Sequence, residues 1–422
     1  MVLLCIFGVV VIGIIVLKVY TYSNLVKDPI FAVYSVTITT FILSRFGLGW
    51  LYLRARSRIV TGEAAEQLYY EPTVAIIVPA YNEPDIAATI RACVSVDYPK
   101  GKLKVVVVDD KSTDNTLELI YRAQIDLEDD EFITVIPLVV NGGKRHALAA
   151  GYAALEPEDG EICVFIDSDS QVTAEGVTKL VAYFRDATVG AVAGHTDVAN
   201  RQTNILTRMQ AMQYYIAFRI YKSAEALFGC VTCCSGCFSG YRRSALEPIL
   251  DPWLKQSFCG MLSTYGDDRS LTNFLLPDWR ILYAPDAQAY TNVPEHLRQL
   301  LKQQLRWKKS WLRECTRAAK VMWRKHPIMV ALFYLGFILP LLAPQVVFRA
   351  MVVQPYFINE LPVWYFGGVA AMAVMYGIYY RAHQSEKRWY QGIFFTLFYT
   401  VILVWQLPYA MATIRDSKWG TR

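Results

Sequence analysis

The sequence predicts an α/β domain with a mostly parallel sheet, set between helices that cross a membrane. Short β-branched runs alternate with helix-compatible stretches in the middle of the chain, and long apolar runs lie on both sides of it. Of the 422 residues, 54% are hydrophobic and 19% are charged, against about 45–50% and about 25% in soluble domains. This composition excludes a disordered chain, a coiled coil and a small disulfide-bonded scaffold.

Five apolar stretches reach or approach the length of about 20 residues that spans a bilayer. They are residues 2–17, 30–53, 328–353, 362–380 and 390–414. The alternative for residues 2–17 is a signal peptide, but this stretch has neither a basic start nor a small-residue cleavage site. Arg45 interrupts the second stretch. Since a charge in lipid is costly, we expect Arg45 to face the interior of the helix bundle.

Basic residues flank the long central region on both sides, directly after residue 53 and in the stretch before residue 328. Cytoplasmic loops carry an excess of Lys and Arg, so we expect a multi-pass protein of the cell (inner) membrane with a cytosolic centre. Three remaining spans would place the C-terminus outside, where Arg415, Lys418 and Arg422 fit poorly. A re-entrant segment would change this count.

The chain therefore divides into four predicted parts. Residues 1–53 hold two transmembrane helices, and residues 54–294 form the cytosolic domain. Residues 295–327 hold an amphipathic helix, in which apolar residues at helical spacing face Lys and Arg, as is typical of a helix lying in the membrane interface. Residues 328–422 hold about three further transmembrane helices.

The cytosolic domain shows strands alternating with helices. The expected strands are residues 73–79, 104–109, 132–139, 161–166 and 189–193, and the expected helices are residues 85–96, 113–125, 144–155 and 174–184. Such alternation predicts a mostly parallel sheet covered on both faces. Ligands of these sheets bind beyond the carboxyl ends of the strands. Polar motifs follow four of the strands there, at Asn82-Glu83, Asp109-Asp110, residues 141–145 and Asp167-Ser168-Asp169.

Asp167 and Asp169 are two carboxylates one residue apart at a strand end. Such a pair suits Mn²⁺ or Mg²⁺, with the remaining coordination left for water and a substrate diphosphate. The alternative is a pair of turn aspartates before a helix. Asp110 is placed to accept hydrogen bonds from a base or ribose, and the alternative is an Asx-turn at Asp109 with Ser112 and Asp114 starting a helix.

Gly142 and Gly143 precede Lys144 and Arg145 at the start of an expected helix. Permissive backbone, two cations and a helix N-terminus together favour a phosphate, and the alternative is a turn with two solvated charges. Four of the nine cysteines crowd into residues 230–237. We interpret them as small residues in a tightly packed segment rather than as a zinc site.

Asp267, Asp268 and Arg269 follow Gly266 in a polar turn. One carboxylate can take a proton from an attacking hydroxyl while its neighbours set its pKa, and the alternative is a helix start with acidic residues in its first turn.

The amphipathic helix carries Gln303, Arg306 and Trp307. Arg306 suits bidentate phosphate contact and Trp307 suits stacking on a base or sugar, whereas the alternative is an ordinary basic surface helix.

Five motifs taken together resemble the processive family-2 glycosyltransferases, which include hyaluronan, chitin and cellulose synthases. They are residues 78–83, 108–110, 167–169 and 266–269 and the Gln303-x-x-Arg306-Trp307 motif. Four segments resemble the hyaluronan synthase branch in particular, namely residues 234–236, 241–243, 266–273 and 303–314. The nodulation chitooligosaccharide synthases are similar too, but tend to have Glu at the position of Asp267. Two departures are Cys237, where proline is usual, and Lys111, where glycine is common.

The resemblance implies a GT-A-type nucleotide-sugar-binding domain joined to a transmembrane bundle by interfacial amphipathic helices. It implies an inverting hexosyltransferase that polymerises hyaluronan from UDP-GlcNAc and UDP-GlcA with Mn²⁺ or Mg²⁺, and exports it through its own channel. The implied partners are these donors, the nascent polysaccharide and membrane lipids, with no nucleic acid. The alternatives are a chitooligosaccharide synthase, an enzyme that loads one sugar onto a lipid phosphate, and a membrane protein that only binds nucleotide.

The resemblance also implies a role for each matching residue. Tyr81, Glu83 and Asp110 contact the uridine, Lys144 and Arg145 help to hold the nucleotide, and Asp167 and Asp169 bind UDP and the metal. Asp268 is the general base, with Asp267 and Arg269 beside it. Gln303, Arg306 and Trp307 close over the diphosphate and the acceptor end, and Ser235 and Gly236 line the acceptor site.

Overall fold

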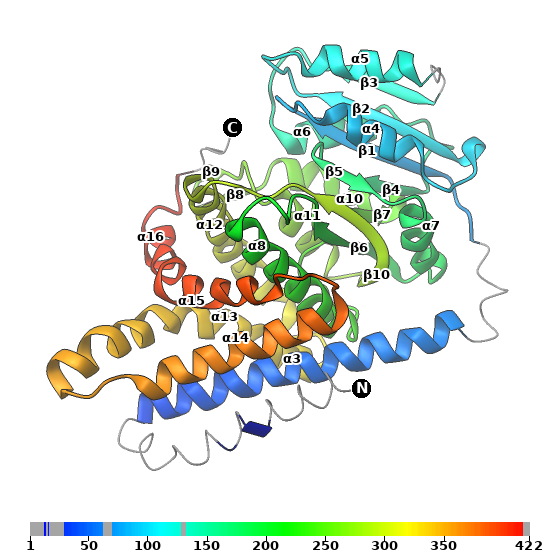
Figure 1. Cartoon of the computed structure of the whole chain (residues 1–422). Helices are drawn as coiled ribbons and strands as arrows, with labels where there is room; N and C mark the ends of the chain where they lie inside the picture. Colours follow the sequence, from blue (N-terminus) through cyan, green and yellow to red (C-terminus); the bar gives the residue numbers. More distant parts are fainter. Residues whose placement is uncertain (1–11, 14–15, 17–28, 62–69, 128–131, 417–422) are drawn as a thin grey trace.

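A computed structural model describes residues 12, 13, 16, 29–61, 70–127 and 132–416. A twisted sheet with its covering helices occupies one side of the molecule, and long apolar helices gather on the other (Figure 1). The first expected span, residues 2–17, lies almost entirely outside the described residues.

The central sheet has eight strands in the order β3-β2-β1-β4-β7-β6-β10-β5. The strands are β1 (Val74–Ala80), β2 (Leu103–Asp109), β3 (Ile133–Pro137), β4 (Ile162–Phe165), β5 (Ser170–Val172), β6 (Val189–Val198), β7 (Ser239–Arg242) and β10 (Arg280–Thr291). The first four in the spatial order run parallel, β7 lies antiparallel between β4 and β6, and β5 is antiparallel to β10. The expected α/β fold is confirmed, and the sheet is mixed but mostly parallel.

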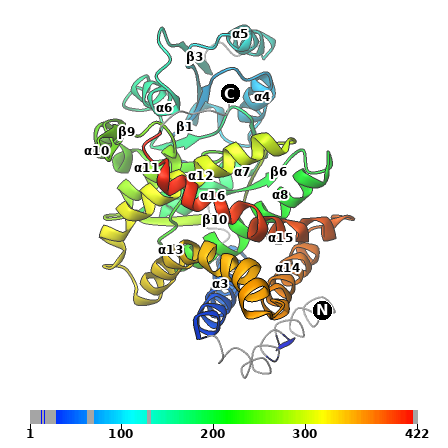
Figure 2. The same cartoon turned by 90° about the vertical axis from the view of Figure 1, so that its left-hand side faces the viewer.

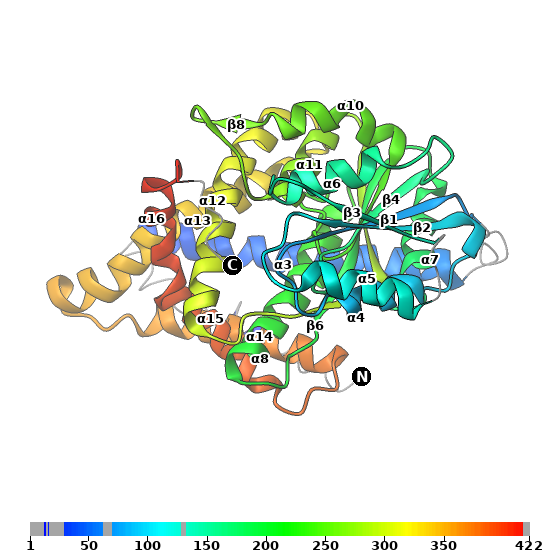
Figure 3. The same ribbon diagram turned by 90° about the horizontal axis from the view of Figure 1, so that it is seen from above.

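Helices cover both faces of this sheet, as Figure 3 shows from above. One face packs against α4 (Ile86–Val94), α5 (Thr116–Asp126) and α7 (Gly176–Val181). The other face packs against α6 (Lys144–Ala153), α10 (Arg243–Leu254) and α11 (Asp267–Leu275). Every residue of β1 and β6 is buried, as is typical of strands covered on both sides. A small hairpin of β8 (Ser257–Phe258) and β9 (Met261–Leu262) links α10 to α11.

Three described helices are long and apolar enough to cross a membrane. They are α3 (Pro29–Thr61), α13 (Pro327–Phe348), which continues as a π-helix over Arg349–Ile358, and α14 (Val363–His383). Figures 1 and 2 both place them together on the side away from β3 and α5. Their lengths and apolar surfaces match the thickness of a bilayer.

Arg45 of α3 points into the protein, as the sequence predicts. Its side chain is buried, and its guanidinium lies 3.0 Å from the carboxylate of Glu225 in α9 (Ser223–Ala226) and over the ring of Phe41. The other carboxylate oxygen of Glu225 accepts hydrogen bonds from the backbone and side chain of Thr232. The helix α8 (Ile205–Ile216) and a π-helical turn (Ala217–Lys222) precede α9. The buried pair therefore joins α3 to the segment that leads toward Ser235.

The amphipathic helix is α12 (Leu297–Met322). Cys315, Ala318 and Met322 belong to the same apolar core as α6, α10 and α11, and Met329 and Phe333 of α13 complete it. The sheet with its covering helices is thus joined to the apolar helices through one continuous core, in which α12 is the link.

The last apolar stretch differs from the expected fifth span. It consists of a 3₁₀ turn (Trp389–Ile393), α15 (Phe394–Val401), a second 3₁₀ turn (Leu403–Trp405) and α16 (Gln406–Ala412), with a bend of 40° between its two halves. Gln406 donates to the backbone of Leu301 and accepts from Lys308, so α16 lies against α12.

Both ends of this last stretch contact the half of the molecule that holds the sheet. Gln391 accepts a hydrogen bond from Arg208 of α8, and the backbone carbonyl of Asp416 accepts from Tyr265 and Lys309. These contacts return the end of the described chain to the half of the molecule that holds the sheet, which fits the alternative of a re-entrant segment better than three straight spans. Polar anchors at Gln391 and Gln406 bring the segment back to α8 and α12, which the apolar content of the sequence alone does not reveal.

Candidate active site

The polar motifs meet at the carboxyl ends of β1, β2 and β4, as parallel pairing requires. Beyond β1, the backbone N–H of Asn82 donates to Ser112 and that of Glu83 donates to Thr116, both of which follow β2. The carboxylate of Glu83 is buried and accepts from the hydroxyl of Ser168, which follows β4. Tyr81, which precedes these residues, is half-buried at the same rim. One rim therefore gathers the residues expected to meet the nucleotide.

Asp110 organises the turn that opens α6. Its two carboxylate oxygens accept hydrogen bonds from the backbone N–H groups of Gly142 and Gly143, each at 2.8 Å. Burial raises the pKa of this carboxyl, although the two backbone donors act in the opposite direction. Gly143 adopts φ +81°, in the left-handed region that glycine favours. A base or ribose that donates to Asp110, as expected, must therefore share the carboxylate oxygens with the backbone donors of this turn.

Lys144, the first residue of α6, connects two acidic motifs. Its ammonium forms an ion pair with Asp167 Oδ1 and lies 3.5 Å from Asp267 Oδ2. Burial lowers the pKa of Lys144, but the attraction of the two carboxylates outweighs it and the pKa is raised. Burial would raise the pKa of Asp267, but Lys144 and Arg145 outweigh it and hold that pKa below its usual value. Both groups are accordingly charged at neutral pH.

Gly236 lies directly against this ion pair. A Cβ atom there would approach Lys144 Nζ to 2.5 Å and both oxygens of Asp167 to 3.1 Å. A small pocket is lined by Lys144, Asp167, Gly236, Asp267 and Asp268 together with apolar side chains from β1, β4, α10 and α11. Ser235, its neighbour in the expected acceptor segment, is half-buried. The structure thus brings Lys144, Asp167, Gly236 and the acidic turn into one pocket.

Arg145 does not accompany Lys144 to the phosphate side, which corrects the expectation for this residue. Its guanidinium is buried and donates to the carbonyl of Trp253, the side chain of Gln256 and the carbonyl of Tyr265. It also lies over the ring of Trp253. Successive helical residues point about 100° apart, so Lys144 and Arg145 cannot share one direction.

The acidic turn, Gly266-Asp267-Asp268, opens α11. Gly266 has φ +75°, and the backbone N–H of Arg269 donates to Asp268 Oδ1 at 2.7 Å. Cys233 donates its thiol proton to Asp268 Oδ2 at 3.5 Å. The carboxylate of Asp268 is only partly buried.

Cys233 lies at the candidate site, which the sequence does not predict. The packing interpretation holds for Cys230 and Cys234, which belong to the core, but the sulfur of Cys233 reaches the acidic turn. Burial raises the pKa of Cys233 to about 12, and the negative charge of Asp268 adds to the effect. The thiol is therefore a hydrogen-bond donor at neutral pH. Its position two residues before the expected acceptor residue Ser235 is the signal in the sequence that points to it.

The helix α12 brings Gln303, Arg306 and Trp307 toward the same site. The ring of Trp307 lies 6.1 Å from that of Tyr214 in α8 and is 37% exposed. Arg306 is close enough to contribute to the low pKa of Asp267. Among the described residues, none donates a hydrogen bond to the buried carbonyl oxygen of the Gln303 side chain. The turn of α12 that carries Gln303, Arg306 and Trp307 therefore lies near Tyr214 and the acidic turn.

Asp167 and Asp169 fit a hard divalent cation. Asp169 Oδ1 accepts from the hydroxyls of Ser170 and Thr291, which fixes this carboxylate to β10. The described residues hold no group of three or more His, Cys, Asp or Glu side chains that would bind a metal by themselves. Mg²⁺ and similar ions commonly take one or two carboxylates and complete their shell with water and substrate phosphates. The donor set is therefore of the kind that needs a phosphate ligand.

Comparisons with known proteins show the family and the fold. The sequence profile described as "Glycosyl transferase family 2" matches residues 75–250. The chain is similar to the N-acetylglucosaminyltransferase of Azorhizobium caulinodans, with 33% identity covering 86% of this chain and 90% of that protein. It is also similar to the hyaluronan synthase of Streptococcus pyogenes, with 28% identity covering 96% of this chain and 94% of that protein.

A solved structure has the same fold. The mannosyltransferase PcManGT from Pyrobaculum calidifontis superposes with a TM-score of 0.57 at 22% identity, covering 92% of this chain and all of that chain. The fold is thus GT-A-like. The chain belongs to glycosyltransferase family 2. Within that family it is related to hyaluronan synthase and to the rhizobial N-acetylglucosaminyltransferases.

Proposed function

We propose that this chain is a processive synthase that adds sugars from UDP-sugars to a growing glycan, and that its product is hyaluronan made from UDP-GlcNAc and UDP-GlcA. One observation carries the proposal. Lys144 connects Asp167, the expected ligand of the donor diphosphate, with Asp267, which lies next to the expected base, Asp268. Donor and acceptor chemistry therefore share one pocket.

The proposed donor site follows the rim of the sheet. Tyr81, Glu83 and Asp110 lie where a uridine would enter. Lys144 faces the diphosphate, and Gln303, Arg306 and Trp307 approach from α12. Asp167 and Asp169 would hold Mn²⁺ or Mg²⁺, which when bound neutralises charge that develops on the leaving diphosphate.

Asp268 is the proposed general base. Its carboxylate removes the proton from the acceptor hydroxyl, and the hydroxyl oxygen forms the new bond to C1 of the donor sugar. The bond from C1 to the UDP oxygen breaks as UDP leaves with the bonding electrons. A single in-line displacement inverts the configuration at C1, and the protein contributes chiefly position and electrostatic stabilisation. Ser235 and Gly236 line the acceptor side of the pocket.

Processivity and export are proposed from the way α12 joins the two halves of the molecule. Its polar face carries Gln303 and Arg306, and its apolar face packs into the core shared with α13. The acceptor therefore leaves the site close to the apolar helices. We propose that the catalytic half lies in the cytosol and that the polymer passes between these helices through the cell membrane.

An oligomer of N-acetylglucosamine is a second candidate product. The relatives named N-acetylglucosaminyltransferase have 33% and 35% identity, against 28% for the hyaluronan synthase. Cys237, where the hyaluronan branch usually has proline, lies in the expected acceptor segment. Burial raises the pKa of its thiol, and the charges of Asp167 and Asp169 add to this effect. A different acceptor-site shape would change the sugar that is accepted.

The test supplies UDP-GlcNAc and UDP-GlcA to the purified full-length chain with Mn²⁺, singly and together, and measures UDP release and polymer size. Hyaluronan synthesis predicts sustained UDP release only with both donors, and a long product that hyaluronidase digests. If UDP-GlcNAc alone gave a product that chitinase digests, the product would be an oligomer of N-acetylglucosamine and not hyaluronan. A single sugar on a lipid phosphate would contradict processive synthesis.

A further inference from the structure

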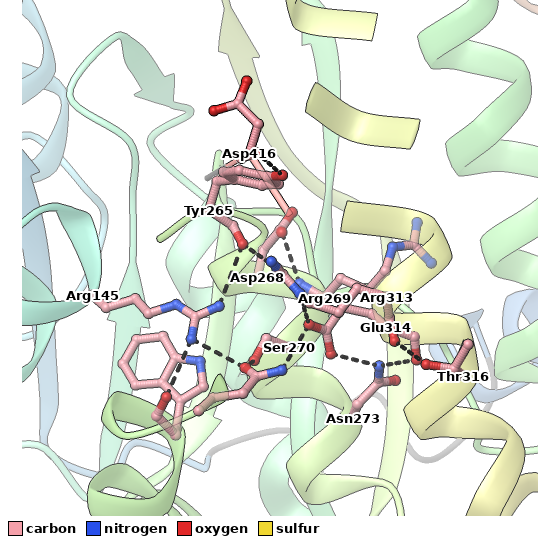
Figure 4. Close-up of polar contacts among 12 residues, drawn as sticks. Arg145, Tyr265, Asp268, Arg269, Ser270, Asn273, Arg313, Glu314, Thr316 and Asp416 are labelled. Atoms are coloured by element: carbon pink, nitrogen blue, oxygen red, sulfur yellow. Dashed lines mark hydrogen bonds and ion pairs between the residues drawn. The ribbon is translucent and has the colours of Figure 1, made fainter. Parts of the chain in front are cut away.

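A buried polar cluster lies between α6, α11 and α12, behind the residues proposed to contact substrate (Figure 4). We call it the Glu314 cluster. Its members are Arg145, Gln256, Ser270, Asn273, Arg313 and Glu314. None of these six residues is assigned a substrate contact by the geometry.

Glu314 is the centre of the cluster, and its side chain is 0% exposed. Its Oε1 atom accepts hydrogen bonds from Gln256 Nε2 and from Arg313 Nε, each at 2.8 Å. Asn273 of α11 donates to the backbone carbonyl of Glu314 at 2.9 Å and more weakly to its side chain. A buried carboxylate is tolerated only when donors of this kind compensate for the lost water.

The cluster reaches the acidic turn through one carbonyl group. Gln256 Oε1 accepts from Arg145 and from the hydroxyl of Ser270. Arg145 and Arg313 both donate to the carbonyl of Tyr265. Figure 4 shows both guanidinium groups reaching this carbonyl. The next residues along the chain are Gly266, Asp267 and Asp268, so the start of the acidic turn is fixed by two cations.

The same helix carries both the cluster and the proposed diphosphate contacts. Gln303, Arg306 and Trp307 are followed at intervals of three and four residues by Ser310, Arg313 and Glu314, which places these six residues along one face of α12. Ser310 packs directly against Gly266. Because α12 is one continuous helix that contacts Gly266 through Ser310, it fixes how far the turn with Gln303, Arg306 and Trp307 lies from the acidic turn.

We infer that Gln256, Arg313 and Glu314 are positioning residues that hold Asp268 in register with the donor diphosphate. The inference rests on the proposed function and adds residues that act on the reaction without touching substrate. A buried ion pair gives little net stability compared with well-packed apolar residues. Placing Asp268 is a function that such a pair fulfils and apolar packing does not.

The test is the change Glu314→Gln in the full-length protein, with steady-state kinetics for UDP-GlcNAc and UDP-GlcA. Glutamine keeps the shape and can keep an oxygen where Gln256 and Arg313 donate. It removes the negative charge that faces Arg313, and it places an NH₂ group at the Oε2 position, opposite the amide donor of Asn273. We expect kcat to fall about tenfold or more, since small misplacements of a catalytic group cost up to about 10²-fold. The KM values and the Kd for UDP should change less than about threefold, because the donor contacts remain. The matched control is Glu118→Gln, which breaks an exposed ion pair with Arg122 and should leave all three constants unchanged.

A milder variant keeps the test decisive if Glu314→Gln does not fold. Ser270→Ala removes one hydroxyl from Gln256 and should lower kcat severalfold with unchanged KM. In the double variant the two losses should be less than multiplicative, because both act through Gln256. Folded variants with unchanged kcat would overturn this inference, whether or not their KM is raised. If the wild type is active in the same assay, the proposed function still stands. A wild type that transfers no sugar would overturn both.

Discussion

Replacing Asp268 with asparagine should lower the rate of sugar transfer by about 10²-fold or more, which is the usual contribution of a general base. Asparagine still accepts the hydrogen bond from the backbone of Arg269, so the turn keeps its shape, but it cannot take a proton. UDP should bind the variant as it binds the wild type, because Asp167 and Lys144 are unchanged. The measurement is UDP release by turnover, alongside UDP binding by calorimetry.

The control for this change is Asp278→Asn, which alters an exposed aspartate just beyond α11 and should leave the rate unchanged. The same pair of variants separates an enzyme from a membrane protein that only binds nucleotide. If Asp268→Asn turned over as fast as the wild type, Asp268 would not be the base. If the wild type bound UDP and never released it from a UDP-sugar, the chain would not be a transferase under these conditions.

Replacing Gly266 with alanine should abolish most of the activity and lower the thermal unfolding midpoint. The added methyl would lie 1.9 Å from Ser310 Oγ and 3.1 Å from the guanidinium of Arg313. Either the acidic turn or α12 must move. The left-handed backbone adds a cost of roughly 1–2 kcal/mol for any residue other than glycine. We expect the displaced turn to carry Asp268 away from the acceptor.

Gly260→Ala is a matched control, because it separates the backbone cost from the clash. Gly260 lies in the β8–β9 turn with φ +80°, and a Cβ atom there would meet nothing within 4 Å. This variant should lose a comparable amount of stability from the backbone alone and keep its kcat. Equal kinetic losses in the two variants would show that α12 does not hold the acidic turn in place.

Much of the catalytic half follows from the sequence. β1, β2 and β4 are apolar at nearly every position, so their parallel pairing and their shared carboxyl rim are predictable from the chain itself. The meeting of Asp110 with Gly142 and Gly143, and of Lys144 with Asp167, follows from that rim. The three helices long enough to cross a membrane follow from length and composition.

Other features depend on contacts between distant residues, which no local pattern encodes. The strand β10 lies between β6 and β5, and its buried residues alternate with partly exposed ones, so it lacks the continuous apolar run of the other central strands. The different directions of Lys144 and Arg145 depend on where the end of α10 and the residues after it place Trp253 and Gln256. The buried contacts of Glu314 exist only when α6, α11 and α12 are assembled. The return of α16 to α12 depends on Gln406 in the same way.

The central claim is that Asp167 and Asp169, with a divalent cation, anchor the donor diphosphate beside Lys144. Calorimetry of UDP with the full-length chain, in Mn²⁺ and in chelator, tests it most directly when the double change Asp167→Asn and Asp169→Asn is compared with the wild type. We expect Mn²⁺ to tighten UDP binding to the wild type about tenfold or more and to leave the double variant unaffected. Equal tightening by Mn²⁺ in both proteins would contradict the account.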